Sequence, residues 1–115
     1  MIFTAKLESE LRGDFYTVLD EINSAIIDRS ATASLEEKSD FAGINAKCAV
    51  RVYERYSYTG QNRVSMNVTL FETDGRLFVS AVTSGGSQAV LFKINTFGEE
   101  AFLDLIRDTV DKYRA

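Results

Sequence analysis

The residues that could carry chemistry in this chain are few, and the most common catalytic side chain is missing. The 115 residues include no histidine and one cysteine, Cys48. Histidine is the usual general base near neutral pH and a leading metal ligand, so its absence excludes Ser–His and Cys–His catalysis and Cys₂His₂ zinc sites. We therefore expect no catalytic residue, no metal site and no cofactor.

A basic and aromatic array on the central segment is the main candidate for a binding face. Its members alternate along two segments that read as neighbouring strands: Lys47, Arg51, Tyr53, Arg55 and Arg63. Phe71, Arg76 and Phe78 continue the same side. Cations interleaved with aromatic rings suit phosphate contacts and base stacking. An ordinary solvated sheet face has the same composition, because long Lys and Arg stems cover apolar surface.

A second candidate is the small-residue stretch Ser84, Gly85, Gly86 and Ser87. Such a stretch can form a nest of backbone N–H groups that binds an anion. Its spacing matches neither the P-loop nor the dinucleotide-binding motif, and glycines at the end of a strand commonly make a plain turn.

The carboxylates offer a weaker candidate. Four of them recur at helical spacing and so share one helix face: Glu100, Asp104, Asp108 and Asp111. A solvated stripe explains this pattern, and a patch for a basic partner is the alternative. An enzyme using carboxylates or tyrosine ranks last, because no motif ties two such groups together.

Period-two and helical patterns predict the elements that must position these residues. Alternation predicts strands near 3–11, weakly near 31–39, and strongly from Ala46, Val64 and Leu77 onward. The turns between the strong strands fall at 59–62 and 73–75, and 40–45 reads as a connection. Asp14 caps a helix that ends near Arg29.

The alternation also predicts which side of each strand faces the core. Cys48, Val50 and Val52 should point toward the helices, together with Val68 and Val79. Arg51 and Arg63 should then point away from the helices.

The last helix is predicted to begin at a capping box formed by Thr96 and Glu99, and to run to about Tyr113. The apolar run 89–94 before it reads as a strand or as a buried connector. The resulting order is β-α-β-β-β-β-α, an α+β two-layer sandwich with two helices on one face of an antiparallel sheet. We expect a single domain over residues 1–115, with the second sheet face exposed.

Charge and hydropathy limit the partners. The net charge of −4 argues against nucleic acid, because phosphate neutralisation needs clustered Lys and Arg. Residues 46–93 carry six basic and three acidic groups, whereas the flanks are acidic. No signal peptide or membrane-spanning run is apparent, and one cysteine cannot form an intramolecular disulfide, so we expect a cytoplasmic protein.

Three stretches resemble one known family. They read RGDFYTVLDEINSAI, CAVRVYERYSYTGQNRVSMNVTLF and TSGGSQAVLFKINTFGEEAFL. The family is a set of small bacterial proteins classed as domain of unknown function 6054. The resemblance implies a stand-alone bacterial domain and supplies no activity, ligand or catalytic residue. In element order the chain also resembles the half-repeat of the TATA-box-binding protein and, less closely, helix-grip proteins.

These observations lead to two functional expectations. The first is a non-enzymatic interaction module or homo-oligomer that uses its exposed sheet face. The second is a protein that binds a small apolar or anionic ligand in a pocket between sheet and helices.

Overall fold

The computed structural model describes the backbone of residues 2–57, 62–86 and 92–115. Five strands and two helices follow one another in the predicted order: β1 (Ile2–Leu11), α1 (Phe15–Arg29), β2 (Ser34–Gly43), β3 (Ala46–Ser57), β4 (Asn62–Thr73), β5 (Arg76–Gly86) and α2 (Phe92–Tyr113). The α+β class and the element order are therefore confirmed.

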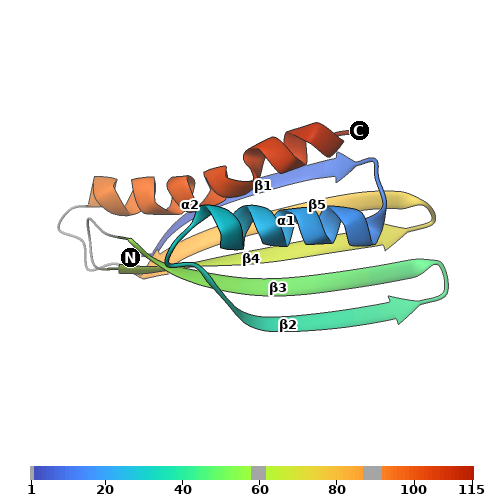
Figure 1. Cartoon of the computed structure of the whole chain (residues 1–115), viewed down its shortest axis with the longest axis horizontal. Helices are drawn as coiled ribbons and strands as arrows, with labels where there is room; N and C mark the ends of the chain where they lie inside the picture. The colour runs from blue at the N-terminus through green and yellow to red at the C-terminus, as the bar shows by residue number, and fades with distance from the viewer. Residues whose placement is uncertain (1, 58–61, 87–91) are drawn as a thin grey trace.

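The strands form one antiparallel sheet in the order β1-β5-β4-β3-β2. Consecutive strands β2 to β5 make a meander, and β1 adds to the far side of β5. Both helices lie on one face of this sheet (Figure 1). α2 packs over β1, β5 and β4, and α1 packs beside α2. The edge strand β2 has no helix over it, and every one of its residues is exposed.

Helix α1 forms as its sequence predicts. The Asp14 carboxylate accepts a hydrogen bond from the Thr17 backbone N–H at 3.0 Å, and this bond holds the pKa of Asp14 below its usual value. The apolar side chains repeat at helical spacing and are buried: Phe15, Val18, Leu19, Ile22 and Ile26.

The hairpin turns follow local backbone chemistry where the structure describes them. Asp74 and Gly75 both adopt positive φ, at 49° and 81°, as the predicted two-residue turn requires. The predicted connection 40–45 is shorter than expected, because β2 continues to Gly43 and only Ile44 and Asn45 lie between the strands. The predicted turn 59–62 falls largely on residues 58–61, which lie outside the described part of the chain.

The predicted start of the last helix is wrong. α2 begins at Phe92, so Thr96 and Glu99 lie inside the helix and cannot form a capping box, which needs its first residue outside. Of the ambiguous run 89–94, residues 92–94 are helical and the rest lie outside the described residues. The tertiary reason is that Glu99 is buried against the sheet and is not available to cap.

The sequence predicted correctly which side of β4 and β5 faces the helices, but its prediction for β3 is wrong. Val68 and Val79 are buried beneath the helices, as expected. In β3 the fully buried residues are Ala49 and Tyr53, which pair with the core residues Leu70 and Met66 of β4. Directly paired residues share a sheet face, so Cys48, Val50 and Val52 point to the face without helices.

Candidate functional site

The predicted basic array is divided between the two faces of the sheet. Alternate residues of a strand point to the same face of the sheet. The helix-facing side of β3 therefore includes Lys47, Arg51 and Arg55 together with the buried Ala49 and Tyr53. Arg63 pairs with Tyr56 on the opposite side and forms an ion pair with Glu54 at 2.7 Å. The five residues therefore do not form the continuous basic face that the sequence suggested.

Each helix-facing cation already has a neighbour within the fold. The Arg51 guanidinium lies 2.9 Å from the Asp40 carboxylate, and its side chain is only 12% exposed. The Lys47 ammonium lies 4.7 Å from the centroid of the Tyr16 ring, and the Arg55 guanidinium lies 5.0 Å from that of Phe102. The first of these contacts is an ion pair and the other two are cation–π pairs, so the three cations do not form one shared basic surface.

Tyr53 is a core residue and not a surface residue. Its hydroxyl donates a hydrogen bond to Asn23 Oδ1 at 2.7 Å, which links β3 to α1. Burial raises the pKa of Tyr53 to about 12. The phenol therefore stays protonated and serves as a buried donor.

The predicted anion-binding turn is largely strand. Ser84, Gly85 and Gly86 belong to β5 and pair with β1, and Ser84 and Gly85 also pair with β4. Backbone groups engaged in a sheet ladder do not form a nest. Ser87 lies outside the described residues.

The face without helices, here called the outer face, carries a row of aromatic residues and not the basic array that the sequence suggested. One register row crosses all five strands and contains Phe41, Cys48, Phe71, Phe78 and Glu10. The next two rows contribute Val50 and Val52 from β3 and Val82 from β5. Phe41 is 67% exposed and Phe71 is 39% exposed. The alternation in the sequence correctly placed Phe71 and Phe78 on the side away from the helices. It wrongly placed Cys48, Val50 and Val52 in the core.

Charged residues on the outer face lie mainly toward its margins. The rows place seven of them there: Lys6, Glu8, Glu10, Glu37, Glu54, Arg63 and Arg76. Three are basic and four are acidic, so the face has a net charge of −1 where the whole chain has −4. The central outward positions are uncharged: Ser65, Asn67, Thr69, Ser80, Val82 and Ser84.

A shallow hollow of about 400 Å³ lies over β1, β5 and β4 on this face. Its walls include Phe71, Phe78 and the carboxylate residues Glu8 and Glu10. The exposed Phe41 lies in the same register row but on β2, on the other side of the central strand β4. A protruding ring and a hollow therefore flank the middle of the sheet.

One buried group stands out on the helix side. Glu99 of α2 is 1% exposed, and neither carboxylate oxygen has a hydrogen-bond partner among the described residues. Burial raises the pKa of Glu99 to about 7. The sequence pattern assigned Glu99 to the capping box, because a glutamate near a helix start is ordinarily a capping group, and it did not indicate that the carboxyl is buried.

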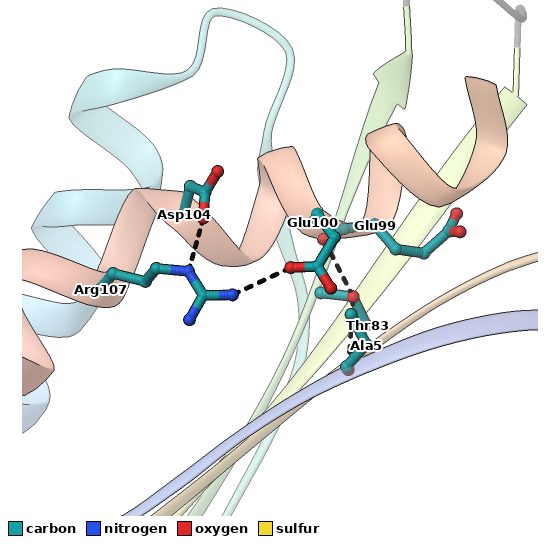
Figure 2. Close-up of polar contacts among 6 residues, drawn as sticks. All are labelled: Ala5, Thr83, Glu99, Glu100, Asp104 and Arg107. Carbon is teal, nitrogen blue, oxygen red and sulfur yellow. Dashed lines mark hydrogen bonds and ion pairs between the residues drawn. The ribbon is translucent and has the colours of Figure 1, made fainter. Parts of the chain in front are cut away.

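The four carboxylates that share one face of α2 are exposed to solvent, which agrees with the interpretation of this pattern as a solvated stripe. Glu100 and Asp104 both pair with Arg107, and Asp111 pairs with Arg114 (Figure 2 shows the first two). Asp108 is exposed.

Metal and membrane signals are absent within the described part of the chain. No group of three or more acidic or cysteine side chains gathers there in a way that could hold a metal ion. None of the described helices combines the length and apolarity needed to cross a bilayer.

Comparison with known proteins shows a family and two distant structural likenesses. The crystal structure of Ara h 8.0201 is 14% identical, with 97% of this chain and 99% of that chain covered and a TM-score of 0.46. The Mll3558 protein from Rhizobium loti is 11% identical, with coverages of 95% and 97% and a TM-score of 0.33. No curated protein matches the chain. The family model named Family of unknown function (DUF6054) matches residues 4–114, and the chain therefore belongs to that family.

Proposed function

We propose that this protein is a non-enzymatic self-association module that forms a homodimer through its outer face. The observation that carries the proposal is the aromatic row Phe41, Cys48, Phe71 and Phe78, which no helix covers. Interfaces are depleted in charge at their centre and enriched in aromatic residues, and the outer face has both properties.

Charge and area favour a second copy of the same chain as the partner. A face with a net charge of −1 repels its own copy far less than the acidic remainder of the surface would. Five strands about 4.8 Å apart and about ten residues long present roughly 800 Å². That area is about what each partner contributes to a standard interface.

The positions of the ring and the hollow favour a two-fold arrangement. A two-fold axis parallel to β4 carries the β2 side of one copy over the β1 side of the other. Phe41 of each copy then lies over the hollow beside Phe71 and Phe78 of its partner. The same contact forms twice, as an isologous interface requires.

Sedimentation velocity over a range of concentrations tests this proposal. The wild-type protein is expected to be a dimer that persists at about 0.5 M salt, because the centre of the interface is uncharged. Phe41→Ala removes the two symmetry-related copies of this contact and is expected to weaken dimerisation about 1,000-fold, the effect of losing two interface hot spots of about 2 kcal/mol each.

Tyr16→Ala is the matched control, since Tyr16 is a similarly exposed aromatic residue (59%) on helix α1. It should leave the dimer unchanged. A wild-type monomer at every concentration contradicts the proposal, and so does a dimer that Phe41→Ala does not weaken.

A small-ligand site is the second candidate, and a hollow at the edge of the sandwich supports it. About 140 Å³ lies between α1 and the β2–β3 hairpin, lined by Phe15, Tyr16, Asp40 and Lys47 among others. Two rings beside an ammonium group suit a small aromatic anion. We expect added benzoate to shift the NMR signals of Tyr16 and Lys47, and the shifts to disappear in Lys47→Ala. Unchanged spectra would remove this candidate.

A further inference from the structure

The unpartnered carboxyl of Glu99 lies in a space that the sheet leaves open for it. A Cβ atom added at Gly85 of β5 would lie 3.3 Å from Cδ of Glu99 and closer still to its Oε1. The same added atom would lie 3.7 Å from Val64 of β4. The absence of a side chain at Gly85 is thus what admits the carboxyl, and no polar atom of the described residues bonds to it there.

The backbone of Glu99 is tied to the sheet although its carboxyl is not. Thr83 Oγ1 donates to the Glu99 carbonyl oxygen at 3.1 Å and lies 3.5 Å from the carbonyl of Ala5 on β1 (Figure 2). This contact brings α2 close to the sheet at Glu99 and holds the side chain in an apolar environment.

The charged groups around Glu99 do not neutralise it within the described structure. From β5 and β4 it faces Thr83, Gly85 and Val64, none of which is charged. The cation of β3 in the same register row as Val64 and Gly85 is Arg55, whose guanidinium packs on Phe102, one turn along α2 from Glu99.

The other charged residues near this part of α2 have partners of their own. Figure 2 shows the Glu99 side chain directed away from Glu100, Asp104 and Arg107, which pair among themselves. From α1, Arg29 donates to the carbonyl of Leu105, more than one turn further along. From β1, Lys6 is on the outer face and pairs with Glu8.

The two halves of α2 are fastened differently. At the C-terminal end, Lys112 binds Glu21 of α1 at 2.8 Å, and Tyr113 also donates to Glu21. The Tyr113 carbonyl accepts from the Arg12 N–H at 2.7 Å. Next to Glu99 stands Gly98, a residue that weakens a helix interior and permits bending.

We propose that Glu99 is a proton-controlled latch between α2 and the sheet. When the carboxyl is protonated, the first half of α2 lies on β5 and β4. When the carboxyl ionises, an open state in which it reaches water becomes more populated, because an unpaired charge is disfavoured in an apolar space. In the open state the helix has left the sheet and unwound up to about Leu103, since a short helix without tertiary packing is not stable in water. The half fastened to Glu21 stays in place.

Amide hydrogen exchange followed by mass spectrometry measures this opening directly. Glu99 has a pKa of about 7 in the closed state and its ordinary value of 4.5 in the open state. After correction for intrinsic rates, exchange in residues 92–103 is therefore expected to rise about 30-fold between about pH 5.5 and about pH 8. Exchange in residues 106–113 is expected to stay constant over the same range.

Two variants and one titration separate the latch from general loosening. Glu99→Gln keeps the shape of the side chain but cannot ionise, so its exchange in 92–103 should not depend on pH. Glu100→Gln, the exposed neighbour, should behave as the wild type does. A rise of equal size in Glu99→Gln overturns the proposal. So does an NMR titration of the wild-type Glu99 carboxyl carbon that gives an ordinary pKa, a result that needs no variant to fold.

Discussion

Replacing Tyr53 with alanine is expected to lower the free energy of unfolding by about 3–5 kcal/mol, the cost of deleting a large buried aromatic side chain. Tyr53 has no exposed surface and pairs with Met66 on the helix-facing side of β3. Its hydroxyl also ties β3 to Asn23 of α1 at 2.7 Å. Urea unfolding followed by circular dichroism measures the change.

Val52→Ala is the matched control, because Val52 is the next residue of β3 and points to the outer face. It should cost less than about 1 kcal/mol in a monomer, since a half-exposed site loses little burial. Tyr53→Phe isolates the hydroxyl and should cost about 1 kcal/mol. If Val52→Ala proved the more damaging of the two alanine variants, the observed phase of β3 would be contradicted.

Glu99→Gln is expected to stabilise the protein at alkaline pH and to have little effect at acidic pH. The folded-state pKa of Glu99 is raised from 4.5 to about 7, so folding takes up a proton between these values. The wild type therefore loses stability as pH rises from 4.5 to about 7, and the loss is complete above that range. From the size of the shift the loss is about 3 kcal/mol, and Glu99→Gln should recover most of it at about pH 8.

Chemical denaturation at several pH values tests the direction of this pH dependence of stability. The stability difference between Glu99→Gln and wild type should grow with pH through this window and then level off. Glu100→Gln serves again as the control, because Glu100 is exposed and paired with Arg107. A stability difference that does not change with pH would show that the pKa of the Glu99 carboxyl is not raised by burial.

The two proposals concern opposite faces and can fail separately. The dimer uses Phe41 and the hollow on the outer face, whereas the latch uses Glu99 and Gly85 beneath α2. A monomeric protein could still show the pH-dependent opening, and a pH-independent protein could still dimerise.

Elements whose formation depends on residues close to one another in the chain could be predicted from the sequence. The Asp14 cap and the helical spacing of Phe15, Ile22 and Ile26 were sufficient to define α1. The Asp74-Gly75 turn follows from backbone dihedrals that few residue pairs adopt readily. In β4 and β5 one side of each strand is apolar and the other is largely polar, so parity alone indicated the buried side.

Parity failed in β3 because both sides of that strand are partly apolar. Val50 and Val52 alternate with Ala49 and Tyr53, and either set could have formed the core. The pairing with β4 selects Ala49 and Tyr53, since these stand opposite Leu70 and Met66. Arg51 is tolerated on that side because Asp40 on the exposed edge strand β2 neutralises it.

The sequence by itself thus determined the order of the elements, the single antiparallel sheet and the helical face of α1, because these depend on local propensity and periodicity. Only the tertiary structure decided which side of β3 is buried, where α2 begins and that Glu99 is enclosed without a partner. Each of those outcomes depends on what packs across from a residue, and that neighbour lies on another strand or helix distant in the chain.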